Sequence, residues 1–182
     1  GWCLSWAAAI HTRLDNGDAA EFWLESFDKF FTNEGDGTLH DASADGLTIL
    51  GRLTADGRPI RANDIMQMDG GMGTTAVIQE MLIHTRRGVT HLFAGAPGRW
   101  RDCAFKQMRT EGAFIISAER RDGVVTSVTV NSECGGTLRL ANPWPGSAAV
   151  AVRGRTRKRI KGGVLRLAMK TGETLRLVAS ST

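Results

Sequence analysis

The chain has 182 residues, of which 42% are hydrophobic and 23% are charged, and its formal net charge is +4. This length allows one domain or two small ones, and the composition is ordinary for a soluble globular protein. No apolar run approaches the roughly 20 residues of a membrane-spanning helix, so we expect no membrane partner.

Two helices are expected at the start of the chain. The first covers 2–14, where apolar residues recur every four positions on one face, at Trp2, Trp6, Ile10 and Leu14. Asp18 can cap the second helix, which carries a seam of closely spaced residues, Ala19, Phe22, Trp23, Ser26, Phe27, Phe30 and Phe31. The short turn between the helices predicts an antiparallel hairpin. One hairpin cannot cover this aromatic seam, which favours formation of a homo-oligomer.

A long segment rich in Gly, Asp and Thr follows, over 33–63, with a short strand expected at 47–50. His40, beside Asp41, is a candidate acid–base or substrate-binding residue there, although an isolated loop histidine is usually just solvated. A third helix is expected over about 74–86, because Thr74 or Thr75 can cap it and a glycine follows its last residues.

The most distinctive motif lies just before this third helix. Asp69 is followed by Gly70, Gly71, Met72 and Gly73, and Gln67 stands two residues before it. The glycines allow a tight turn and the close approach of a ligand. Asp69 would then stand at the mouth of the helix, either as a turn-forming or capping residue or as a reactive carboxylate. No Lys-Ser/Thr pair follows, which counts against a phosphate-binding loop.

From Val89 the apolar residues alternate with polar ones, which predicts strands. Seven segments show this alternation, at 91–93, 114–118, 124–130, 138–140, 150–152, 165–167 and 175–177. Glycine-containing turns separate several of them, and short strands at this spacing predict an antiparallel β-sandwich. Trp100 and Trp144 lie in loops between strands and are candidates for exposed platforms that stack on sugars. Trp2 and Trp6 could also stack on sugars, but their helical stripe favours core packing.

The positive charge is concentrated between 153 and 161, where Arg153, Arg155, Arg157, Lys158, Arg159 and Lys161 leave the rest of the chain with a net charge of −2. On one strand the odd-numbered residues of this run would share a side. Such a strand could bind polyanions or acidic glycans. We favour an edge strand, because cations there prevent pairing between sheets. Aromatic residues that would stack on bases are absent from the run, so we expect no nucleic acid partner.

The three cysteines and four histidines show no ligand spacing, so we expect buried free thiols and neither a metal ion nor a cofactor. The chain begins at Gly1 without a methionine and shows no secretory signal. Its compartment therefore stays open.

Three segments, in chain order, resemble glycoside hydrolase family 95, the inverting α-L-fucosidase-type enzymes. Gly1-Trp2-Cys3-Leu4-Ser5-Trp6 is similar to a Gly-Trp-Ser-x-Ala-Trp helix start, and Gln67 to Gly73 resembles a Gln-x-Asp-Gly-Asn-Phe-Gly segment. Residues 122–140 resemble the C-terminal β-domain. The chain departs from the family at Gly71 and Met72, where the family has Asn and Phe, and over 35–63.

The resemblance implies an α+β fold. Residues 1–88 would be helical hairpin pieces of an (α/α) six-hairpin barrel, and residues 89–182 would be a C-terminal antiparallel β-sandwich. Much of the barrel would then precede Gly1. An oligosaccharide or glycan is the implied partner.

The resemblance also implies glycosidic bond hydrolysis with inversion. Asp69 would be the base that activates water, and Gln67, Gly70 and Gly71 would shape the substrate site. Inversion needs a second carboxyl group about 6.5–9.5 Å from the first, and the family's general acid lies upstream of anything present here. We therefore expect the chain alone to be inactive. Replacement acids stay open among Glu25, Glu34, Asp36, Asp41 and Asp64, whereas Glu80 is expected to be solvated.

Two other functions stay open. One is a non-catalytic carbohydrate-binding β-sandwich, in which Trp100, Trp144 or the basic strand touches the glycan. The other is a galactose-mutarotase-like sugar epimerase, because that fold is often associated with glycosidases of this architecture, although the β region is short for it.

Overall fold

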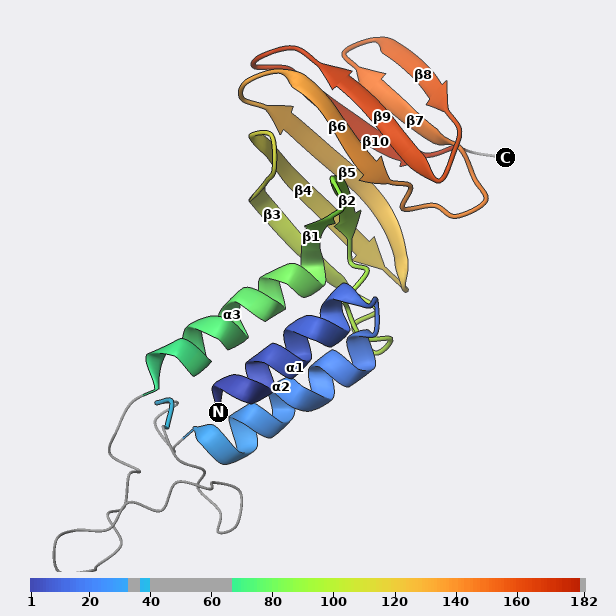
Figure 1. Ribbon diagram of the computed structural model, residues 1–182. Coiled ribbons are helices and arrows are strands. Elements are labelled where there is room, and N and C mark those ends of the chain that lie inside the picture. Colours follow the sequence, from blue (N-terminus) through green and yellow to red (C-terminus); the bar gives the residue numbers. More distant parts are fainter. Residues whose placement is uncertain (33–36, 40–66, 181–182) are drawn as a thin grey trace, which may run out of the picture. The chain divides into compact units, whose positions relative to one another are not determined.

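The computed structural model describes residues 1–32, 37–39 and 67–180 (Figure 1). The chain divides into two compact units, Gly1–Glu80 and Met81–Thr182. Helices come first and strands follow in two sheets, so the expected α+β architecture is confirmed. The strand expected at 47–50 lies outside the described residues.

No helix among the described residues is long and apolar enough to cross a membrane.

The first two helices are α1 (Trp2–Arg13) and α2 (Gly17–Phe31), and they pack side by side as the expected hairpin (Figure 1). The N-cap of α2 is Asn16 rather than Asp18. The Asn16 side chain accepts a hydrogen bond from the Ala19 N–H at 3.2 Å, because a cap reaches the free amide three residues ahead. Asp18 lies in the first turn, where its charge interacts favourably with the helix dipole.

The buried face of α1 is made of small residues instead of its large apolar ones. Ser5, Ala8 and Thr12 are buried, whereas the apolar stripe is exposed, at Trp2, Trp6, Ile10 and Leu14. Trp6 is 64% exposed, and its ring meets that of Trp2 edge to face at 4.5 Å. The expectation of core packing for Trp2 and Trp6 is therefore wrong, because small side chains let helix backbones approach closely on the opposite face.

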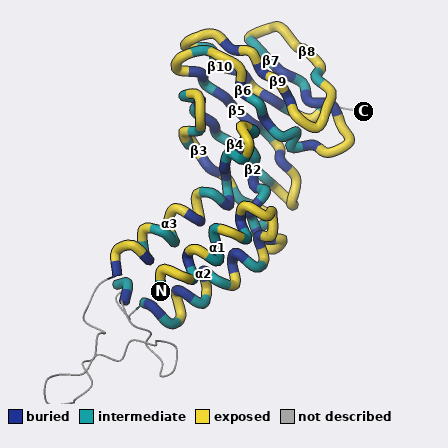
Figure 2. The backbone as a smooth tube through the Cα atoms, in the orientation of Figure 1, coloured by how far each residue is buried: buried dark blue, intermediate teal, exposed yellow. Residues whose placement is uncertain are grey.

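The buried face of α2 is also rotated from the expected seam. Ala20, Leu24, Phe27 and Phe31 are buried, and the Phe27 and Phe31 rings stack at 6.1 Å. Phe22 is 59% exposed, while Trp23 and Phe30 are half-buried. The seam is thus partly uncovered. Figure 2 shows exposed positions recurring along both helices.

The third helix, α3, spans Met68–Leu82 and leads directly into strand β1 (Ile83–Arg86). The sequence predicted a helix over about 74–86, so its start and its end are both wrong. The glycine motif lies in the first turns of α3 instead of in a turn before it. Residues 83–86 had been assigned to the helix and are a strand.

The strands form two sheets (Figure 1). In the six-stranded sheet the order is β3 (Cys103–Thr110), β4 (Phe114–Arg121), β5 (Val124–Ser132), β10 (Thr174–Ala179), β7 (Ala149–Arg153) and β8 (Thr156–Ile160). In the four-stranded sheet it is β1, β2 (Val89–Leu92), β6 (Gly136–Ala141) and β9 (Val164–Met169). All pairs are antiparallel except β2 with β6.

The inner faces of the two sheets share one core. Buried side chains alternate with exposed ones along the strands, for example over the whole of β9 (Figure 2). Their cluster joins Ile116 and Leu177 of the larger sheet to Leu140 and Leu167 of the smaller one. This pattern is that of a two-layer sandwich, in which inward residues of both sheets interdigitate.

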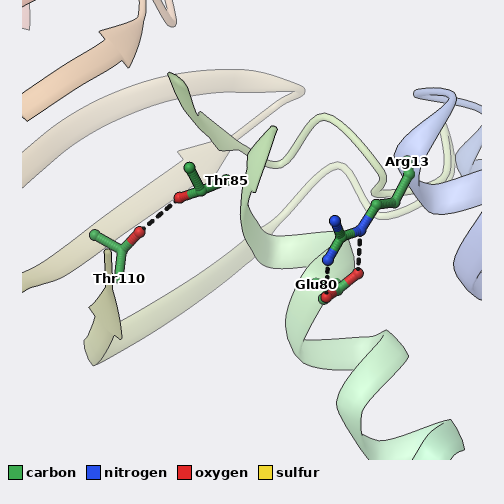
Figure 3. Close-up of polar contacts among 4 residues, drawn as sticks. All are labelled: Arg13, Glu80, Thr85 and Thr110. Carbon is green, nitrogen blue, oxygen red and sulfur yellow. Dashed lines mark hydrogen bonds and ion pairs between the residues drawn. The ribbon is translucent and has the colours of Figure 1, made fainter. Parts of the chain in front are cut away.

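Polar contacts join the two layers at two places. The hydroxyls of Thr85 in β1 and Thr110 in β3 lie 2.8 Å apart (Figure 3). Arg153, the last residue of β7, donates from Nη2 to the Ala168 carbonyl of β9 at 2.7 Å. Arg153 also donates from Nε to Oε1 of Glu173 at 2.6 Å. These contacts tie backbone and side chains of one sheet to the other.

Candidate functional site

Asp69 lies in the first turn of α3 and its side chain is exposed. Its Oδ1 accepts a hydrogen bond from the Gly70 N–H at 2.9 Å. A carboxylate in a first turn is stabilised by the free amides and the positive end of the helix dipole. Asp69 is therefore fixed at the N-terminus of α3 with its side chain exposed to solvent. This arrangement is compatible with a residue that stabilises the helix and equally with a base that activates water.

Gln67 precedes α3 and is 6% exposed. Its N–H donates to the Thr38 carbonyl at 3.1 Å, and its own carbonyl accepts from the Thr38 hydroxyl at 2.7 Å. The side-chain Oε1 is buried with no hydrogen-bond partner in the described part of the chain. Gln67 thus fixes the start of the helix through its backbone, and its amide oxygen stays available as an acceptor.

The three glycines of the motif allow close packing. A Cβ added at Gly70 would lie 2.9 Å from the Phe27 ring, and one at Gly71 would lie 2.7 Å from Thr38 Cγ2. A Cβ at Gly73 would lie 3.2 Å from the Cβ of Ser5. The tight-turn role expected for these glycines is wrong, because α3 already contains them. Because they have no side chains, the backbone of α3 packs directly against Phe27, Thr38 and Ser5.

Ser5 of α1 forms hydrogen bonds with the first turns of α3, where the two helices are in close contact. Its hydroxyl donates to the Gly70 carbonyl at 3.0 Å and lies 2.8 Å from the hydroxyl of Thr74. Thr74 also donates to the same carbonyl at 2.9 Å. The segment that carries Asp69 is therefore fixed by hydrogen bonds on its buried side.

A groove of about 410 Å³ follows one face of α3 and is lined by Met68, Gly71, Met72, Thr75, Ala76 and Gln79. Asp69 precedes Met72 by three residues, so the two are neighbours on the helix surface. Gly71 contributes only backbone atoms to the lining of the groove, because it has no side chain. Asp69 therefore lies beside two exposed methionines that line the groove, Met68 and Met72, but is not itself one of the lining residues.

Glu80, expected to be solvated, forms an ion pair with Arg13. The Arg13 Nε donates to Glu80 Oε2 at 2.8 Å, and Nη2 contacts Oε1 (Figure 3). This two-point pairing occupies both carboxylate oxygens. Glu25 is exposed on α2. The remaining candidates lie outside the described residues, namely His40, Glu34, Asp36, Asp41 and Asp64.

Trp144 is not an exposed platform. Its side chain is 5% exposed, and its indole Nε1 donates to the Val125 carbonyl at 2.7 Å. A buried indole with its N–H satisfied belongs to the core, and Trp144 is part of the sandwich cluster. Trp100 is half-buried. The prediction that Trp144 stacks on a sugar as an exposed ring is therefore wrong.

The basic run is divided between two strands. Strand β8 is the edge strand of the larger sheet, as expected, but Arg153 ends β7 and the turn between them holds Arg155. The Lys170 N–H, 2.7 Å from Oε2, and the Arg153 guanidinium hold the pKa of Glu173 below its ordinary value. Arg153 is thus neutralised between the sheets and does not belong to an exposed patch.

The cysteines are all free, but Cys3 and Cys134 are exposed, contrary to expectation. Cys103 is half-buried, and burial raises the pKa of its thiol.

The sequence matches no family model and no curated protein. Among solved structures, the chain is similar to a GH127 β-L-arabinofuranosidase from Geobacillus stearothermophilus T6. The identity is 16%, the match covers 62% of this chain and 19% of that chain, and the TM-score is 0.32. The chain thus spans about a fifth of the length of that enzyme.

Proposed function

We propose that this chain is the C-terminal part of a carbohydrate-active enzyme that resembles glycoside hydrolase family 95. In the complete enzyme Asp69 would activate water for hydrolysis with inversion. The observation that carries the proposal is the position of Asp69: an exposed carboxylate in the first turn of α3, next to Met68, which lines a groove. The motif from Gln67 to Gly73 supports it in the sequence.

The chemistry needs a base that stays ionised and touches water. The base removes a proton from the water that attacks the anomeric carbon, while an acid on the opposite face protonates the leaving oxygen. The Gly70 N–H orients one oxygen of Asp69. Glu80 is held by Arg13 and is poorly suited to act as the acid. A chain with the base alone should not turn over substrate, so we propose that residues 1–182 are inactive by themselves.

The test is Asp69→Asn in a longer enzyme that contains this chain. We expect hydrolysis to fall by about 10²–10⁴-fold while glycan affinity is kept. Asp18→Asn is the matched control, because Asp18 is also an exposed aspartate in the first turn of a helix. Turnover that survives Asp69→Asn would show that the base is another residue. Turnover by the isolated chain would refute its proposed inactivity.

A carbohydrate-binding sandwich is the second candidate. Trp144 is buried and is removed as a sugar platform, whereas Trp100 is half-buried. A groove lined by Arg159 and Lys161 at the basic edge of the sandwich favours binding through charge. Glycan binding that is lost on changing that edge, and kept in Asp69→Asn, would favour this candidate.

A further inference from the structure

A second groove, of about 730 Å³, opens at one end of the sandwich. It lies where the β6–β7 connection, over 142–148, meets the β8–β9 turn, over 161–163. Ser180, just after β10, completes its lining. Ligand sites in proteins commonly have volumes of about 300–1,000 Å³, and the volume of this groove falls within that range.

The walls of the groove are fixed to one another by Asn142. Its side-chain amide donates to the carbonyls of Ser147 at 2.8 Å and Gly162 at 3.1 Å. Its backbone N–H donates to the Gly163 carbonyl at 2.9 Å. Both connections are therefore held by one residue, and a ligand would not have to order them on binding.

The groove is positively charged. Arg159 and Lys161 line it, and none of the lining residues is acidic. Neither cation forms an ion pair with another residue that the structure describes, in contrast to Arg153, which is paired with Glu173. The two cations are two residues apart at the end of β8, roughly 7 Å along an extended chain. They can contact neighbouring anionic groups of one ligand.

Two hydroxyl residues, Ser147 and Ser180, also line the groove. No aromatic residue that the structure describes lines it, and Trp144 of the same connection is buried in the core. Bases of single-stranded nucleic acids need aromatic rings to stack on. Sugars instead offer hydroxyls for hydrogen bonds, and a planar carboxylate suits the fork of an arginine.

We propose that this groove binds an acidic oligosaccharide, with Arg159 and Lys161 contacting its carboxylate or sulfate groups. Ser147 and Ser180 contact sugar hydroxyls. The groove lies wholly within the sandwich unit. Its binding does not depend on the role proposed for Asp69.

The test is calorimetric titration of the full 182-residue chain with a galacturonate hexamer and with a heparin-derived hexasaccharide. The methyl-esterified galacturonate and a single-stranded DNA of six phosphates serve as comparisons. We expect at least one acidic saccharide to bind at least about tenfold more tightly than the neutral one. Which of the two binds better distinguishes a carboxylate from a sulfate ligand. Added salt should weaken the binding because it screens charges.

Matched variants locate the site. Arg159→Gln with Lys161→Gln should weaken binding by at least about tenfold. Lys158→Gln should change it less than about twofold, because Lys158 pairs with buried Ala151 and so lies on the opposite face of β8. Gly163→Leu should block the groove without changing charge. A Cβ there meets nothing within 4 Å, so thermal unfolding should be unchanged.

The proposal is overturned if neither acidic saccharide binds at millimolar concentration. Equal weakening by Lys158→Gln, or unchanged binding in Gly163→Leu, would also overturn it. DNA that binds as tightly as the saccharides would mean a general polyanion surface instead. Any of these results leaves the hydrolysis test on Asp69 unaffected.

Discussion

The two units of the protein differ in how far their large apolar side chains are buried. The sandwich collects its large apolar side chains into one core, and Val124 and Val164 are the only exposed large hydrophobics among its described residues, 81–180. In the described part of the helical unit such residues are exposed along all three helices, including Trp6 of α1, Phe22 of α2 and Met72 of α3. A continuous exposed apolar stripe usually marks an interaction surface. The sandwich therefore buries most of its own large apolar side chains, whereas the helical unit has an exposed apolar face that a partner could cover.

The largest expected effect is on stability, and it sharpens this contrast. Leu167→Ala, in the sandwich core, should lower the free energy of unfolding of the sandwich by about 2–5 kcal/mol, because it leaves a cavity. At a concentration low enough for the chain to be monomeric, Trp6→Ala should change stability by about 0.5 kcal/mol or less, because the side chain is mostly exposed. Urea unfolding followed by circular dichroism measures both. Similar losses for the two variants would contradict the contrast.

An intermediate effect is expected inside the helical unit. Gly70→Ala should destabilise it by about 1–3 kcal/mol, because the new Cβ would lie 2.9 Å from the Phe27 ring. Gly163→Ala in the sandwich is the control, since it has open space around the added atom. Differential scanning calorimetry compares them. If Gly70→Ala were stabilising, as alanine normally is in a helix, the packing role given to the motif would be wrong.

The smallest effect is a pH dependence in the sandwich. The pKa of Glu173 is lowered by the Lys170 N–H and by Arg153. Its stabilising contribution is therefore complete above the ordinary glutamate pKa of about 4.3, and it is lost as the pH falls through the folded value. Glu173→Gln should lower Tm at pH 7, and its difference from the unchanged protein should shrink below about pH 4.

Glu133→Gln is the control for this prediction, because its ion pair with Arg109 is exposed and should contribute little. A Tm difference for Glu173→Gln that is constant from pH 7 to pH 3 would contradict the linkage.

The strands were largely predictable because their signal is local. In β9 every second residue is buried, and a period of two is visible in the sequence alone. Strand β3 was missed because a bulge between Phe105 and Met108 shifts its register. Gln107 takes a positive φ of 54° there, which breaks the alternation. No local pattern signals that interruption.

The helical site was harder to predict because it depends on tertiary contacts. Glycines usually mark turns, and only the nearness of Phe27 and Thr38 shows why Gly70 and Gly71 lie in a helix. The four-residue spacing of Trp2 and Trp6 revealed a shared face of α1. It could not say that the opposite face, with Ser5, would be the buried one.

The most direct test of the contrast is sedimentation velocity of the chain at micromolar concentration. We predict self-association through the exposed stripe of α1, abolished by Trp6→Glu and kept in Val164→Glu, which changes an exposed apolar residue of the sandwich. A chain that stays monomeric throughout, or one whose association is lost equally in both variants, would contradict the account.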